Sequence, residues 1–189
     1  MTDCNHVKPT LVNYGESYIE LSTNRTIFFV EDFTDQSCVE LSAMLMYLDS
    51  IKNDLITIYI NSPGGHVSGL YNVLNTIYMI NSPIRTVCIG QACSAGAVLL
   101  SAGNKGERYA FSSAEIMIHG MSAPFPSFNS TIPESNSRLK FLKSHGDDII
   151  KILAKNCNQP FSKVKKDCMI DNYMTPKEAK KYNIIDNII

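Results

Sequence analysis

The stretch Ile84–Ala102 reads IRTVCIGQACSAGAVLLSA, and it predicts the fold of the chain around it. Ile84–Ile89 has the pattern of a strand, Gly90–Cys93 that of a tight turn, and Ser94–Ala102 that of a helix of small apolar residues. Strands that alternate with helices in this way are typical of α/β folds with buried, mainly parallel strands. We therefore expect the same order on both sides of this stretch.

The segment before it repeats the order. Leu55–Ile60 is a continuous, largely β-branched run, which predicts a strand covered on both faces. It ends in the turn signal Asn61–Gly65. The helix after this turn, ending near Asn81–Pro83, has one apolar face formed by Val67, Leu70, Leu74 and Ile77. Further upstream, the patterns predict strands at Ser17–Leu21 and Thr26–Val30 and an amphipathic helix that opens near Thr34, with Cys38, Leu41, Leu45 and Leu48 inward.

The segment after it is more varied. Glu115–Ile118 predicts a short strand that ends at His119. The next stretch, Gly120–Pro133, holds three prolines and three serines and should be irregular or extended. Beyond it we expect a long helix at Glu134–Cys157, a helix with a capping box at Thr175–Glu178 that Asn183 closes, and a strand at Ile184–Ile189. No linker or repeat divides the chain, so we expect one domain over residues 1–189.

The composition excludes several classes of protein. The 189 residues are 44% hydrophobic, and 17 Lys+Arg against 18 Asp+Glu leave a net charge of −1, which fits neither a disordered chain nor a nucleic-acid-binding protein. The longest nearly apolar stretch, Ile89–Leu100, is too short to span a bilayer. The first residues, Met1–His6, lack the pattern of a secretory signal. Six cysteines without a C-x-x-C pair indicate reduced thiols in an intracellular protein.

Ser94 is the first candidate for chemistry. It follows a predicted strand and opens a helix, and Gly96 completes half of a nucleophile-elbow pattern in which Ala92 replaces the expected glycine. The alternative is that Ser94 only caps the helix. The turn at Asn61–Gly65 lies at the same sheet edge, so the backbone N–H groups of Gly65 and Ala95 could converge on one oxygen. The alternative there is a plain turn.

A nucleophilic serine requires a base and an acid that orients the base. Of the four histidines, His119 is the one that closes a predicted strand next to the other two turns, which makes it the candidate base. Two acids near the final capped helix, Asp167 and Asp171, are candidates for the third role. The spacing of these residues does not decide between them.

Four blocks of sequence carry a resemblance to a known family: Tyr59–Gly65 (YINSPGG), Gly90–Gly96 (GQACSAG), Met117–His119 (MIH) and Asp171–Thr175 (DNYMT) with Glu178, Ala179 and Tyr182. In this order they resemble the Clp protease proteolytic subunit, a serine peptidase of the Clp/crotonase superfamily, from about Thr26 to Ile188. The resemblance implies an α/β spiral of repeated β-β-α units with a protruding helical handle at about residues 120–157. It also implies a variable N-terminal segment at residues 1–16.

The resemblance also implies roles for residues. Ser94 would be the nucleophile, His119 the general base and Asp171 the acid that orients it, while the backbone N–H groups of Gly65 and Ala95 would form the oxyanion hole. No metal or organic cofactor is implied. The implied protein is a subunit of stacked heptameric rings that cleaves peptides and unfolded proteins and receives folded substrates from a Clp-type AAA+ ATPase. The chain itself has no phosphate-binding G-x-x-x-x-G-K-[ST] motif.

Two other functions stay open beside this one. They are a non-catalytic ring subunit of a mixed assembly and a crotonase-type acyl-CoA enzyme, which shares the fold but needs no serine nucleophile. The implied location is the cytoplasm, an organelle stroma or matrix, or a host cytoplasm if the source is viral.

The chain departs from the family pattern in the handle. Gly120–Met121 stand where the family usually has Gln-Pro, and Ala123–Phe128 contain two prolines that remove backbone donors. We therefore expect an altered inter-ring strand. One aromatic residue often used for partner docking is replaced by Thr57, while Tyr59 remains.

Overall fold

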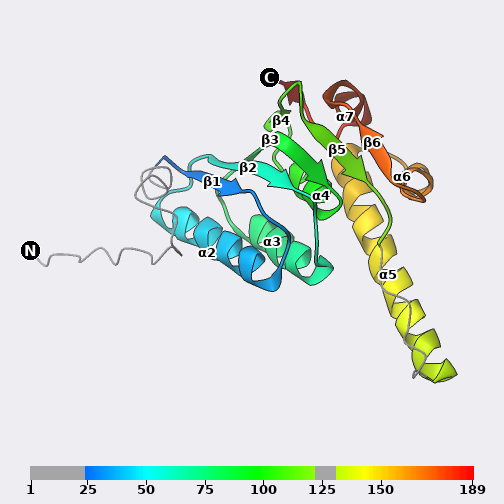
Figure 1. Ribbon diagram of the computed structural model, residues 1–189. Helices are drawn as coiled ribbons and strands as arrows, with labels where there is room; N and C mark the ends of the chain where they lie inside the picture. The colour runs from blue at the N-terminus through cyan, green and yellow to red at the C-terminus, as the bar shows by residue number, and fades with distance from the viewer. Residues whose placement is uncertain (1–23, 122–130) are drawn as a thin grey trace, which may run out of the picture.

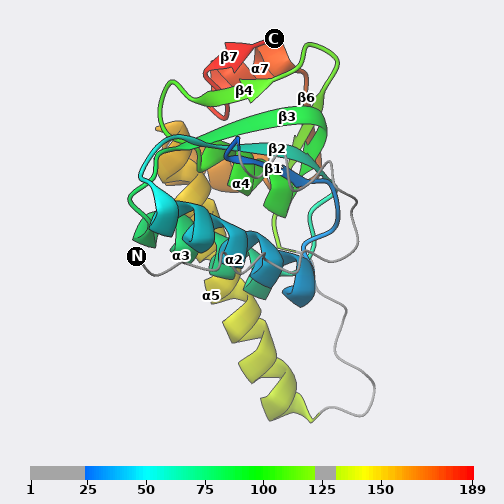
Figure 2. The ribbon, with the colours of Figure 1, turned by 90° about the vertical axis from the view of Figure 1, so that its left-hand side faces the viewer.

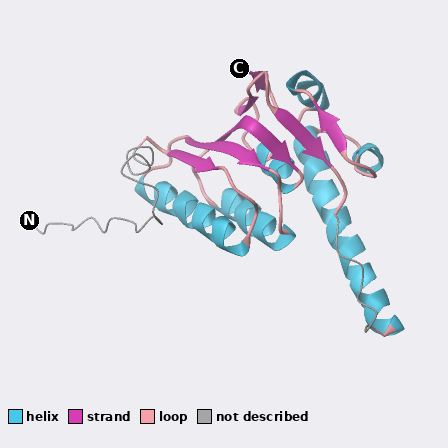
Figure 3. Cartoon of the chain, in the orientation of Figure 1, coloured by secondary structure: helices cyan, strands magenta, loops and turns pink. Residues whose placement is uncertain are grey.

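The centre of the molecule is a mainly parallel sheet. The computed structural model describes residues 24–121 and 131–189, and within them the sheet has seven strands (Figures 1 and 3). Five of them pair in the order β1 (Thr26–Phe29), β2 (Ile56–Ser62), β3 (Ile84–Cys93), β4 (Arg108–Ala110) and β7 (Asn187–Ile188), all parallel. The other two are β5 (Glu115–Ile118), parallel to β3, and β6 (Asn172–Met174), antiparallel to β5. The predicted α/β class is confirmed.

The long strand β3 joins two parts of this sheet. Its first half, Thr86–Cys88, pairs with Arg108–Ala110 of β4, and its second half, Gln91–Cys93, pairs with Glu115–Met117 of β5. The predicted tight turn at Gly90–Cys93 is therefore wrong, because these residues continue the strand and share its ladder with β5.

Two helices, α2 (Asp35–Ile51) and α3 (Val67–Met79), lie side by side against one face of the sheet (Figures 1 and 2). Burial in β2 therefore alternates: its isoleucines are fully buried, whereas Thr57 and Tyr59 are half-buried. The strand is therefore covered less completely on its second face than predicted. On its open face, Tyr59 stacks on Phe28 of β1 with ring centroids 4.9 Å apart.

The longest helix, α5 (Ile132–Cys157), projects beyond the rest of the molecule (Figures 1 and 2). Its C-terminal part is held in the core by Ile150 and Leu153, whereas Ile132 at its other end is 78% exposed. The helix begins two residues earlier than predicted. Thr131 and Glu134 form a reciprocal capping box, and a proline is tolerated in a first turn because its missing N–H would have no helical acceptor there.

The structure also contains short elements that the sequence patterns did not predict, namely β4, β6 and α6 (Phe161–Asp167). The remaining helices are α4 (Ala95–Ser101) and α7 (Pro176–Tyr182). Asn183 closes α7 in the left-handed conformation, with φ of 70°, as predicted. The last strand is shorter than predicted because Ile184 and Ile185 pack into the core before it begins.

Some predictions concern residues that the structure does not describe. The strand at Ser17–Leu21, the N-terminal segment 1–16 and the proline-containing stretch Ala123–Phe128 all lie outside the described residues. Among the residues that are described, no helix is both long and apolar enough to cross a bilayer.

Candidate active site

Three neighbouring strands bring the candidate residues together. Cys93 at the end of β3 is paired with Met117 of β5, and Ile118 of β5 is paired with Asn172 of β6. Because β6 runs antiparallel to β5, Asp171, which precedes β6, lies opposite His119, which follows β5. Ser94, His119 and Asp171 therefore each lie just beyond a ladder, at one edge of the sheet.

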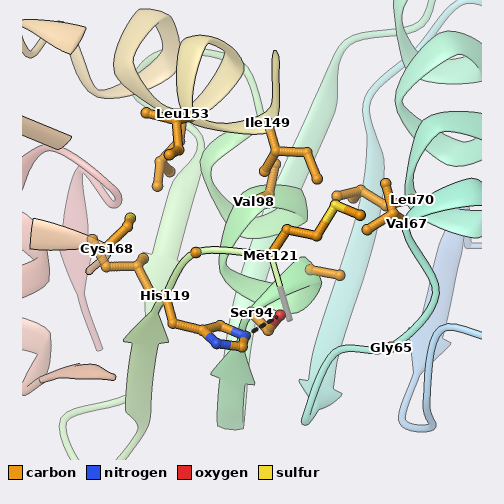
Figure 4. A pocket seen from close by; sticks show the side chains of 14 residues that line it. Gly65, Val67, Leu70, Ser94, Val98, His119, Met121, Ile149, Leu153 and Cys168 are labelled. Atoms are coloured by element: carbon orange, nitrogen blue, oxygen red, sulfur yellow. Dashed lines mark hydrogen bonds between the residues drawn. The ribbon is translucent and has the colours of Figure 1, made fainter. Parts of the chain in front are cut away.

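Ser94 forms the sharp junction between β3 and α4. Its φ of 55° and ψ of −119° lie outside the regions that non-glycine residues usually occupy, a strain of about 1–3 kcal/mol that is typical of functional sites. Its backbone N–H donates to the Met117 carbonyl at 2.8 Å, which fixes the junction to β5. Although Ser94 occupies the cap position of α4, its side chain makes no capping hydrogen bond. The hydroxyl instead lies 2.8 Å from His119 Nε2 (Figure 4).

His119 is held between the serine and one acid. Its Nδ1 lies 3.5 Å from Asp171 Oδ1, and the side chains are 22% and 58% exposed respectively. Asp167, the other candidate acid, is engaged elsewhere: it accepts a hydrogen bond from the Tyr182 hydroxyl at 2.8 Å and pairs with Lys163 at 2.7 Å. Of the two acids that the spacing left open, the structure places Asp171 beside His119.

The glycine turn after β2 packs directly against the serine junction. Gly64 has φ of 101°, and a Cβ added to it would lie 2.7 Å from the Cβ of Ser94. Gly65, with φ of 146°, lies opposite Phe33 in a parallel bridge. The two hydrogen bonds of this bridge join Phe33 to Gly64 and His66, the neighbours of Gly65. In the part of the chain that the structure describes, the N–H groups of Gly65 and Ala95 have no protein acceptor. Gly65 and Ala95 line the same pocket as Ser94, so N–H groups there could donate to an oxygen bound beside the serine.

An apolar pocket opens beside the serine and the histidine (Figure 4). Its walls come from α3, α4 and α5 and from the segments that follow β2, β5 and α6. The side chains that Figure 4 labels around it, besides Ser94 and His119, are Val67, Leu70, Val98, Met121, Ile149, Leu153 and Cys168. None of them is charged, so the pocket fits an apolar side chain of a bound substrate.

The thiols near the site are poor nucleophiles. Burial, together with the nearby carboxylate of Glu115, raises the pKa of Cys93, so the residue next to Ser94 stays a protonated thiol at neutral pH. Burial likewise raises the pKa of Cys168, to about 11. Ser94 is therefore a better candidate nucleophile than either cysteine. Over residues 24–121 and 131–189, no group of three or more His, Cys, Asp or Glu side chains is arranged to bind a metal ion.

Comparison with known protein families identifies the chain. The model of the Clp protease family matches residues 13–189, which is nearly the whole sequence. The chain belongs to the Clp protease family. It is accordingly a Clp-type peptidase, and the resemblance drawn from the four sequence blocks is confirmed, as is the α/β architecture that it implied. Membership of the Clp protease family also implies, in general terms, self-assembly and an ATPase partner.

Sequence patterns missed part of this site. The predicted apolar face of one helix includes Val67 and Leu70, and the predicted long helix contains Ile149 and Leu153. Periodicity does not tell that these residues meet over Ser94. Cys168 gave no signal as a pocket residue. For Gly64 a signal did exist, since two consecutive glycines after a buried strand favour positive φ, but the contact with Ser94 depends on the tertiary fold.

Proposed function

We propose that this Clp-type peptidase is a serine endopeptidase whose catalytic triad is Ser94, His119 and Asp171. The observation that carries the proposal is the 2.8 Å contact between His119 Nε2 and Ser94 Oγ, made by a serine with strained backbone and no capping role. A hydroxyl held on imidazole in this way is the arrangement that activates serine for nucleophilic attack.

The mechanism follows from the positions of these atoms. His119 Nε2 takes the proton of Ser94 Oγ while the oxygen attacks the carbonyl carbon of a peptide bond. Asp171, on the Nδ1 side, holds the ring in the tautomer that leaves Nε2 free to accept, and it stabilises the imidazolium. The imidazolium then protonates the leaving amine, and the acyl-enzyme forms. A water molecule, deprotonated by His119, releases the acyl group and restores Ser94.

The oxyanion of the tetrahedral intermediates would be bound by the N–H groups of Gly65 and Ala95. One such donor is worth ~10²–10³ in kcat when it is pre-positioned. The apolar pocket would receive the side chain next to the scissile bond, so we propose cleavage after medium-sized apolar residues.

At the level of assembly, we propose stacked heptameric rings that enclose the sites, with a Clp-type AAA+ ATPase supplying unfolded chains. This part rests on family membership and on the absence of a nucleotide-binding motif from the sequence. We place the assembly in the cytoplasm, an organelle interior or a host cytoplasm. The free, buried state of Cys38, Cys88, Cys93, Cys157 and Cys168 supports a reducing compartment.

The two alternative functions are less well supported. A non-catalytic ring subunit has no need of an activated serine, and an acyl-CoA enzyme of the crotonase type would use the oxyanion donors without the Ser94–His119 contact. The geometry therefore favours the peptidase over both.

The test is covalent labelling with a fluorophosphonate probe, followed by peptide mapping. We expect the label on Ser94, and we expect Ser94→Ala to lose both labelling and peptide hydrolysis while it keeps its fold and assembly. Cys93→Ala is the matched control, one residue away, and should keep most of its activity because that buried thiol stays protonated at neutral pH. Hydrolysis that survives in Ser94→Ala and disappears in Cys93→Ala would overturn the assignment.

A further inference from the structure

The segment that carries Asp171 is held only at its two ends. It runs from the end of α6 to the start of β6, and its side chains Met169 and Ile170 are 79% and 77% exposed. Asp171 itself is 58% exposed, and its contact with His119 is the interaction that ties it to the site. The position of Asp171 therefore depends on how firmly α6 and β6 are anchored.

The anchor at the α6 end is weak by itself. This helix has seven residues, of which only Val164 is buried, and helices this short are not stable without tertiary contacts. On one side, Lys165 pairs with Asp147 of α5 at 2.7 Å, but this pair is partly exposed, and such pairs contribute little. A further polar tie is made by the last residue of the helix, Asp167.

Asp167 is bound to the neighbouring helix α7 through Tyr182. The Tyr182 hydroxyl donates to Asp167 Oδ2 at 2.8 Å, and Lys163 both pairs with this carboxylate at 2.7 Å and lies 3.9 Å from the centre of the Tyr182 ring. The Asp167 side chain is only 25% exposed, so this hydrogen bond is shielded from water. Burial of Tyr182, reinforced by the bond to Asp167, raises the pKa of its hydroxyl, which therefore remains a donor throughout the physiological range.

The next residue links this contact to the histidine. The carbonyl of Cys168 accepts a hydrogen bond of 2.6 Å from the N–H of Gly120, which directly follows His119. The segment from Cys168 to Asp171 thus starts at a point fixed both to α7, through Asp167, and to the chain next to the base.

We propose that Tyr182 is a positioning residue for the reaction: by holding Asp167 at the end of α6, it keeps Asp171 within reach of His119. This inference rests on the proposed triad. It assigns a role to an aromatic residue of α7 that does not contact the reacting atoms.

The experiment compares Tyr182→Phe with the wild-type protein in the hydrolysis of a short fluorogenic peptide. Loss of the orienting acid altogether costs ~10⁴ in kcat, and a small misplacement costs less, so we expect Tyr182→Phe to lower kcat about tenfold. We expect KM to change less than about twofold, because the pocket and the oxyanion donors stay in place.

The same substitution in an Asp171→Ala background separates positioning from general destabilisation. With no carboxylate left to position, Tyr182→Phe should cause no further loss of the residual rate. Asp49→Ala is the control for stability. It removes the acceptor of three hydrogen bonds from Asn81 and Ser82, at the opposite edge of the sheet, and should destabilise the fold without lowering kcat.

A second pair of variants keeps the test decisive if Tyr182→Phe folds poorly. Asp167→Asn retains an oxygen that can accept from Tyr182 and should keep most of the activity, whereas Asp167→Ala should reproduce the loss. The proposal is overturned if neither Tyr182→Phe nor Asp167→Ala lowers kcat, or if the loss is equally large in the Asp171→Ala background. If Ser94→Ala keeps its activity, the proposed triad is wrong. If Ser94 and Asp171 are essential for activity but Tyr182→Phe leaves kcat unchanged, only the positioning role of Tyr182 is wrong.

Discussion

Gly64→Ala tests whether the glycine turn sets the position of the nucleophile. The added Cβ would lie 2.7 Å from the Cβ of Ser94, 2.8 Å from the carbonyl oxygen of Cys93 and 3.1 Å from the nitrogen of Ala95. Two of these neighbours are backbone atoms, which cannot rotate away. The junction that holds Ser94 must therefore shift by several tenths of an ångström or more.

The size of the effect has two parts. An alanine at φ of 101° adopts a conformation that L-residues disfavour, and this strain lowers the stability by about 1–3 kcal/mol. The displaced serine loses its alignment with His119, and a misplacement of about 1 Å can cost ~10² in rate. We therefore expect kcat/KM to fall about 100-fold, which corresponds to roughly 2.7 kcal/mol in the activation barrier.

Gly106→Ala is the matched control. Gly106 has φ of 89°, so alanine there is similarly strained, but nothing lies within 4 Å of the added Cβ. Both variants should lower the midpoint of denaturant unfolding, Gly64→Ala by more because its Cβ also collides with backbone atoms, while only Gly64→Ala should lose activity in a peptide assay. Wild-type kcat/KM in Gly64→Ala, or an equal loss in Gly106→Ala, would refute the reasoning.

Three further predictions concern the acid, the core and the substrate. Asp171→Asn should lower kcat by up to ~10⁴, because the amide can hold His119 in the wrong tautomer; steady-state kinetics on a short peptide checks this. Asp186→Asn should destabilise the fold by about 3 kcal/mol in denaturant unfolding, because it leaves Arg108, 1% exposed, buried without its carboxylate. Burial alone would raise the pKa of Asp186, but the hydrogen bonds from Arg108 lower it below the usual 3.8, so its contribution to stability is present above pH 3.8 and should be lost as the pH falls through the lowered pKa. Without nucleotide or partner, the protein should digest an unfolded peptide and leave a stably folded protein intact, since unfolding a domain costs about 5–15 kcal/mol; rapid digestion of the folded protein would contradict a gated chamber.

The parts of the fold that local patterns encode were predictable. The run of β-branched and small apolar residues around Ser94 predicted a strand that passes into a helix, and His119 was placed correctly at the end of β5. The capping residues Thr175 and Asn183 likewise mark the ends of α7, because each satisfies backbone groups that a helix end leaves free.

The parts that depend on distant pairing were not predictable from patterns. Strand β6 has three residues, too few to show an alternation of buried and exposed positions, and it is a strand because β5 lies beside it. For this reason spacing could not choose between Asp167 and Asp171. In the structure the carboxylate of Asp167 is bound by Tyr182 of another helix and does not contact His119.

The sheet brings the three residues of the proposed triad, which lie far apart in the sequence, to one edge. Parallel pairing of β3 with β5 brings Ser94 and His119 to one edge, since both strands run toward it. Asp171 directly precedes β6. Because β6 is antiparallel to β5, it begins at the edge where β5 ends, which places Asp171 beside His119. Ser94 and His119 are thus fixed by buried ladders, whereas Asp171 precedes a three-residue strand and follows an exposed segment. Of the three groups the acid is the one whose position the sheet constrains least, and contacts outside the sheet must hold it there.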